Sequence, residues 1–136
     1  MKMAVAAMLV AILQTGLPMR SIDQGQQSGI DVAKQVSARS VEEWDALWKA
    51  HAGGRARPSV DFSKDIVAAV FLGSRPSGGY SVQIVGVRQE GAALVVSYKE
   101  TRPAPDALTA QVLTSPYHIV AIPKGTATEV KFERVS

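Results

Sequence analysis

The sequence has no cysteine and only two histidines among its 136 residues, and these absences exclude several kinds of chemistry. Without cysteine there is no disulfide, no zinc–thiolate site, no thiol nucleophile and no lipid-bearing cysteine. The histidines lie far apart, and no carboxylate cluster accompanies them, so neither a zinc nor a calcium site is predicted. The glycines of residues 73–79 lack the lysine and the following helix of a phosphate-binding loop, and we expect no cofactor.

Basic residues form no run, and their excess over acidic residues is small. The chain has 15 Lys and Arg against 12 Asp and Glu. Residues 1–20 hold Lys2 and Arg20 and no acid, which leaves 13 − 12 = +1 for the remainder. This balance predicts no nucleic acid as a partner, and membrane contact is expected only through the N-terminal segment if it is retained.

The N-terminal segment has the layout of an export signal. Lys2 precedes an apolar run from Met3 to Leu13, and Gly16 and Pro18 follow it. The run is shorter than the about 20 apolar residues that span a membrane. We expect residues 1–20 to be a signal peptide or an N-terminal apolar anchor, residues 21–29 a disordered linker and residues 30–136 a single domain. The domain would then be periplasmic, in the cell envelope or extracellular.

Residues 40–51, SVEEWDALWKAH, have the periodicity of an amphipathic helix. Ser40 and Glu43 have the spacing of a capping box at its start. Three- and four-residue intervals predict one inward stripe, made of Val41, Trp44, Leu47, Trp48 and His51. We expect His51 to cap the helix C-terminus as a cation. Gly53 and Gly54 are expected to end the helix in the left-handed conformation.

The rest of the chain has the pattern of short β-strands. Residues 66–73, IVAAVFLG, are almost wholly apolar, as in a central strand covered on both faces. Residues 80–87 and 93–100 alternate around a turn at residues 89–91 and predict an antiparallel hairpin. Other strands are predicted in residues 30–38, 111–123 and 128–135, with a proline-containing loop at residues 103–107. The fold class is α+β, mainly β: an antiparallel sheet or sandwich of about six strands with one helix packed on it.

His118 is the histidine with hydroxyl groups nearby in the sequence. Thr114 and Ser115 precede it, and a hydrolase would use the imidazole as a base toward a neighbouring hydroxyl. Side chains so close along a strand point alternately to opposite faces, and no third residue that would orient the imidazole is evident. We therefore predict no catalytic residue and a protein that is not an enzyme, with a hydrolase that uses His118 as an alternative.

The segment RPSGGY, residues 75–80, forms a proline-braced corner between two predicted strands. Gly78 and Gly79 permit positive φ angles, and tyrosine is a residue type that often anchors interfaces. Tyr80 is then available to a partner. In the other interpretation the corner is an ordinary turn. Tyr80 then belongs to the core, because it lies on the same face of the strand as Val82 and Ile84.

Three separated segments resemble the C-terminal domain of the PrcB family, whose members are accessory subunits of secreted protease complexes. They are FLGSRPSGGYSVQIVGV, VVSYKETRPAPDA and LTSPYHIVAIPK. VEEWDALWKAHAG and VDFSKDIVAAVFLG are also similar, so the resemblance runs from about Val36 to Lys124. The family more often has Thr-Gly-Gly-Tyr, and Ser77 keeps the hydroxyl. The resemblance implies an exported domain that associates with a protease in the cell envelope and stabilises it.

Two segments are predicted to contact such a protein partner, because loops on a rigid sheet commonly carry recognition. The first is the corner: Arg75, Pro76, Ser77, Gly78, Gly79 and Tyr80. The second is Thr114, Ser115, Pro116, Tyr117 and His118. SGGY also resembles the Thr-Gly-Tyr loop with which chagasin-related inhibitors enter a cysteine-protease cleft. The alternative that follows from this likeness is direct inhibition of a peptidase by residues 77–80.

Overall fold

The computed structural model describes residues 16–135, which contain seven strands and one helix. In chain order they are β1 (Arg20–Gly25), β2 (Lys34–Ala38), α2 (Val41–Ala52), β3 (Asp65–Phe71), β4 (Ser81–Glu90), β5 (Ala93–Thr101), β6 (Tyr117–Pro123) and β7 (Glu129–Val135). The predicted mainly β fold with one helix is confirmed. Most of the predicted export signal, residues 1–15, falls outside the described residues. Within residues 16–135 no helix has the length and hydropathy that crossing a membrane requires.

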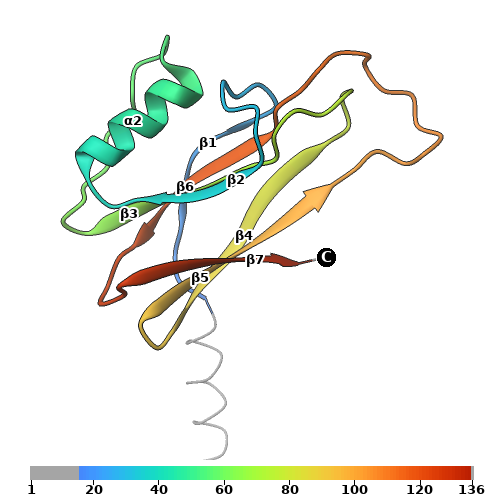
Figure 1. Ribbon diagram of the computed structural model, residues 1–136. Coiled ribbons are helices and arrows are strands. Elements are labelled where there is room, and N and C mark those ends of the chain that lie inside the picture. Colours follow the sequence, from blue (N-terminus) through green and yellow to red (C-terminus); the bar gives the residue numbers. More distant parts are fainter. Residues whose placement is uncertain (1–15, 136) are drawn as a thin grey trace, which may run out of the picture.

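Two sheets pack face to face, and α2 covers the outer face of the larger one (Figure 1). The larger sheet has the strand order β1-β6-β3-β2 and is antiparallel throughout. The smaller sheet has the order β4-β5-β7, and β7 is parallel to β5. The predicted antiparallel pairing holds for every pair of neighbouring strands except β5 and β7. The chain leaves β5 for β6 in the other sheet before it returns, and such a crossover permits parallel pairing.

Strand β3 lies inside the larger sheet, and both of its faces are covered. One set of alternate side chains packs toward the smaller sheet: Ile66, Ala68 and Val70. The other set packs in the cluster that contains the helix tryptophans: Val67, Ala69 and Phe71. This double burial explains the apolar run, and the predicted central position is confirmed.

The helix begins at its predicted cap. The Ser40 hydroxyl accepts a hydrogen bond from the Glu43 N–H at 3.2 Å. The Glu43 carboxylate accepts from the Arg39 N–H at 2.7 Å, one residue earlier than in a standard capping box. Val41 is 48% exposed and does not belong to the inward stripe, which was therefore predicted one turn too long.

The helix ends without the predicted left-handed glycine. Gly53 has φ −58°, an ordinary helical value. The last turn is instead closed by Gly29, whose N–H donates to the carbonyl of His51 at 2.8 Å. A Cβ at Gly29 would lie 2.5 Å from the carbonyl oxygen of Ala50. Glycine is therefore required there by close approach to the helix end.

Residues 21–29 do not form the predicted linker. Their first part belongs to β1, an edge strand that pairs with β6. Beyond β1, the Ser115 N–H donates to the Gln26 carbonyl at 2.7 Å, and the Ser28 N–H donates to the Ser115 carbonyl at 3.1 Å. The segment is polar because much of it is exposed at a sheet edge, and edge strands often carry polar residues.

Candidate functional site

In the corner between β3 and β4, Gly79 packs closely against Pro103 of the segment that follows β5. Gly79 has φ +91°, a value that other residues rarely adopt. A Cβ added to Gly79 would lie 2.8 Å from Cβ of Pro103. The second glycine of the corner is therefore needed for its backbone angle and for its packing.

Backbone hydrogen bonds join the corner to the loop of residues 102–113, which follows β5. Arg75 and Thr114 exchange two of them, at 2.7 and 3.0 Å. The Gly78 N–H donates to the Ala110 carbonyl at 2.9 Å, and the Thr114 hydroxyl donates to the Ser77 carbonyl at 3.0 Å. The corner and this loop lie together at one end of the sandwich, away from α2 (Figure 1). We call them together the corner–loop surface.

The loop of residues 102–113 exposes three large apolar side chains. Leu108 is fully exposed, Leu113 is 71% exposed and Val112 is 53% exposed. Exposed apolar groups that lie together in a monomer often mark an interaction site. Sequence reasoning treated residues 103–107 as an interruption and placed Val112 and Leu113 in a predicted strand of residues 111–123, but the observed strand begins only at Tyr117.

Tyr80 is half-buried and lies apart from the helix and its tryptophans. The guanidinium of Arg75 is 5.8 Å from the centre of the Tyr80 ring, within the range of a cation–π interaction. Pro76 and Gly79 are exposed, and Ser77 and Gly78 are half-buried. The first predicted contact segment is thus partly accessible along its whole length.

The second predicted contact segment is buried, and its prediction as a surface is corrected. Thr114, Tyr117 and His118 are at most 5% exposed, Ser115 is 9% exposed and Pro116 is also buried. The reason is that β6 lies inside the larger sheet, between β1 and β3. Thr114 forms hydrogen bonds with Arg75 and Ser77 of the corner. The rest of the segment belongs to the core.

His118 joins the two sheets through its ring. The Ile84 N–H of β4 donates to Nδ1 at 2.8 Å, so the proton of the neutral imidazole is on Nε2. Nε2 lies 2.9 Å from the Ser21 hydroxyl and therefore donates to it. An imidazole with this arrangement has no lone pair with which to deprotonate Ser21. The hydrolase alternative gains no support from this geometry.

Acidification is expected to destabilise the protein through His118. Burial holds the pKa of His118 below its usual value, because the charged ring would lose its solvation. A proton on Nδ1 would also face the Ile84 N–H with a second donor. Since the pKa is lower in the folded state, the stabilising contribution is complete above about pH 6.5 and decreases as the pH falls toward the folded pKa. Urea unfolding between about pH 7.5 and 5 measures this decrease.

The control for this pH dependence is His118→Asn, whose side-chain oxygen can accept from Ile84 but does not titrate. The variant should lose less unfolding free energy than the wild type over the same pH range. Parallel pH profiles for the two proteins would contradict the role assigned to His118.

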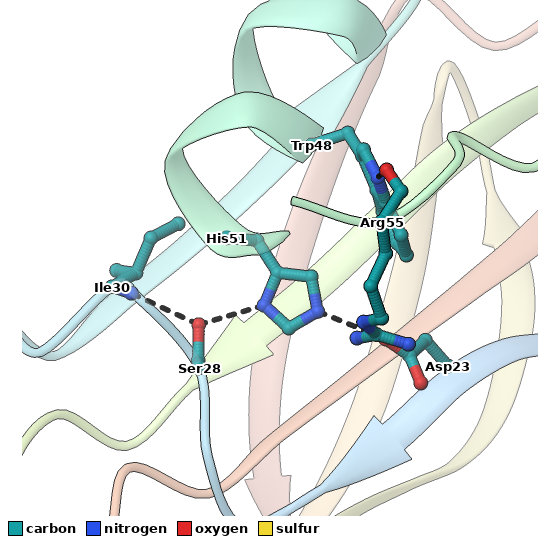
Figure 2. Close-up of polar contacts among 6 residues, drawn as sticks. All are labelled: Asp23, Ser28, Ile30, Trp48, His51 and Arg55. Carbon is teal, nitrogen blue, oxygen red and sulfur yellow. Dashed lines mark hydrogen bonds and ion pairs between the residues drawn. The ribbon is translucent and has the colours of Figure 1, made fainter. Parts of the chain in front are cut away.

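A second histidine lies between a serine and an aspartate (Figure 2). Nδ1 of His51 is 2.7 Å from the Ser28 hydroxyl, and Nε2 is 2.9 Å from the Asp23 carboxylate. Arg55 donates to the same carboxylate at 2.7 Å. Burial alone would raise the pKa of Asp23, but the hydrogen bonds from His51 and Arg55 outweigh it and hold the pKa below its usual value.

This serine–histidine–aspartate cluster resembles a hydrolytic triad in composition, but its surroundings do not. Acyl transfer needs free N–H donors near the serine to stabilise an oxyanion. Here the Ser28 N–H donates to Ser115, the Gly29 N–H to His51 and the Ile30 N–H to the Ser28 hydroxyl. The cluster therefore anchors the helix end to the β1 segment. The cation capping predicted for His51 is corrected, because the ring bonds side chains and not helix carbonyls.

Within the part of the chain that the structure describes, no three His, Asp or Glu side chains are placed to hold a metal ion.

Comparison with known families gives a match of residues 66–123 to the family described as PrcB C-terminal. The match runs from β3 to β6, includes the corner and the loop, and confirms the predicted resemblance over this segment. No curated protein and no solved structure is significantly similar to the chain.

Proposed function

We propose that the protein is an exported accessory domain that binds and stabilises a protease in the cell envelope, because residues 66–123 match the PrcB C-terminal family. The domain supplies a binding surface and no catalytic group. The observation that carries this proposal is the corner–loop surface. It presents exposed apolar side chains on a segment that backbone hydrogen bonds fix to the sandwich.

The rigidity of this surface favours binding, because a segment that is already ordered loses less conformational entropy when it docks. Gly78 and Thr114 anchor the loop to the corner at two points. Leu108 and Leu113, which lie on either side of Ala110, keep their side chains in solvent. Burying large apolar side chains of this kind on a partner is the main favourable contribution in most protein interfaces.

The proposed function is tested with the full-length protein, tagged and recovered from the envelope fraction of cells that produce it. We expect the recovered partner to be a protease when identified by mass spectrometry. We also expect that protease to have a shorter lifetime in cells that lack the protein, because it loses the stabilisation that binding gives. Recovery of no protease, or an unchanged lifetime, would overturn the proposal.

Leu113→Asp is expected to reduce the amount of recovered protease at least about tenfold, and more when combined with Leu108→Asp. The matched control is Val41→Asp, which makes the same kind of change at an exposed position on α2. All of these variants should unfold within about 0.5 kcal/mol of the wild type, because the substituted side chains are exposed. Equal losses of binding in Leu113→Asp and Val41→Asp would show that the corner–loop surface is not the contact.

The recovered complex also separates the accessory role from the chagasin-like alternative. A corner that entered the protease cleft at Ser77 to Tyr80 would abolish peptide hydrolysis at an equimolar ratio. A stabilising subunit leaves the protease active. Hydrolysis of a fluorogenic peptide by the complex, before and after the domain is removed, distinguishes the two.

A further inference from the structure

Three arginines converge on one carboxylate beside the corner–loop surface. Glu100, near the end of β5, has a side chain that is only 6% exposed. Its oxygens lie 3.4 Å from the guanidinium of Arg75, 3.8 Å from that of Arg102 and 3.9 Å from that of Arg134. The arginines come from the corner, the start of the loop and β7, so the fold assembles a cluster that is scattered in the sequence.

This cluster carries more positive charge than Glu100 can neutralise. Three guanidinium groups against one carboxylate leave a local excess of two positive charges. Arg102 and Arg134 are 63% and 56% exposed, and neither donates a hydrogen bond to another residue within 16–135. Their donors are therefore available to a ligand, while Glu100 holds them near one another.

The charge lies next to apolar side chains. Arg75 exchanges backbone hydrogen bonds with Thr114, the residue that follows Leu113, and Arg102 is the first residue of the loop. A partner that covers both parts must offer negative and apolar groups side by side. Guanidinium groups bind carboxylates well because their planar N–H donors match the two oxygens.

We propose that the arginine cluster around Glu100 binds carboxylate side chains of the protein that docks on the corner–loop surface. The partner segment is thus acidic as well as apolar. This inference rests on the proposed function and names the chemistry of its partner. The observations favour a protein over an anionic membrane, because lipid binding of this kind uses clusters of about four to eight basic residues. Here the excess is two charges, and the group already held is a carboxylate.

The test is an NMR titration of the full chain with the peptide acetyl-Glu-Leu-Glu-Leu-Glu-amide. The control peptide is acetyl-Gln-Leu-Gln-Leu-Gln-amide, which has the same length and apolar content. We expect the acidic peptide to shift the side-chain Nε–H signals of Arg75, Arg102 and Arg134 and the backbone signals of residues 108–113. Its binding should weaken with added salt, as expected for exposed charges.

Charge reversal provides the matched variants. Arg102→Glu with Arg134→Glu is expected to weaken the acidic peptide at least about fivefold. Lys49→Glu with Lys64→Glu changes the net charge equally at a distance from the cluster and should have no effect. Equal binding of the two peptides, absent shifts, or equal weakening by both double variants would overturn the proposal. Binding to phosphatidylglycerol vesicles without binding to the acidic peptide would also overturn it.

The protease-recovery experiment separates this inference from the function on which it rests. If Leu113→Asp abolishes recovery and Arg102→Glu with Arg134→Glu does not, the carboxylate inference fails and the accessory function stands. If both abolish recovery and Lys49→Glu with Lys64→Glu does not, both are supported. Failure of the wild-type protein to recover a protease is evidence against the accessory function itself.

Discussion

Replacing Trp44 with alanine is expected to lower the free energy of unfolding by about 4 kcal/mol. The Trp44 ring is 1% exposed and packs against Trp48, with ring centres 5.5 Å apart. Its indole N–H donates to the carbonyl of Pro58 at 2.8 Å. The substitution leaves a large cavity between α2 and the outer face of the larger sheet. It also leaves the Pro58 carbonyl without this donor.

The control is Val41→Ala, in the first turn of the same helix. Val41 is half exposed, so its substitution should change the free energy of unfolding by less than about 0.5 kcal/mol. Urea unfolding monitored by circular dichroism measures both variants. Similar losses for the two would mean that the helix does not dock through the tryptophan side of its surface.

Replacing His51 with alanine is expected to cost about 3 kcal/mol of unfolding free energy. The ring is 3% exposed, and its centre lies 4.2 Å from that of Tyr117. The variant loses this packing and leaves the Ser28 hydroxyl and the Asp23 carboxylate without their shared partner. Asp23 keeps its ion pair with Arg55, which limits the loss.

A comparison of His51→Ala with Ser28→Ala tests whether the cluster is structural. We expect Ser28→Ala to lower the free energy of unfolding by about 1 to 2 kcal/mol. It removes one hydroxyl, which forms hydrogen bonds with His51 and with the Ile30 N–H. Urea unfolding at neutral pH gives both values. A loss below about 1 kcal/mol for His51→Ala would contradict the anchoring role, since a buried ring with two polar partners should cost more.

The sequence was most informative where local periodicity and burial agree. The cap at Ser40 and the three- and four-residue spacing of Trp44, Leu47 and Trp48 locate α2 within one residue of its observed start. The apolar run in residues 66–73 identifies a strand covered on both faces, and the structure shows the two layers that cover it. Such features depend on neighbouring residues along the chain and therefore appear in its pattern.

Features that depend on distant pairing could not be found in this way. Strand β1 is polar because it lies at an edge, so its pattern resembles a linker until its partner β6 is known. The parallel pairing of β7 with β5 follows from the crossing of the chain between sheets. Asp23, Ser28 and His51 come from separate segments, as do the arginines around Glu100, and no local spacing predicts either cluster.

The candidate site was predicted in part. The corner was located from its glycines and proline, but the loop that completes the surface was not. The reason is that Leu108 and Leu113 become informative only when the structure shows that they are not part of a strand or the core. Thr114 to His118 were misplaced for the opposite reason, because polar residues in a strand pattern gave no sign of their burial.

The central claim, that the corner–loop surface contacts a protease, is tested most directly by site-specific photocrosslinking in intact cells. A photoreactive phenylalanine analogue is placed at position 113 in one protein and at position 41 in another, and both positions are exposed in the unmodified protein. The account predicts a crosslinked product with a protease from position 113 and none from position 41. A protease crosslink from position 41 with none from position 113 would contradict it.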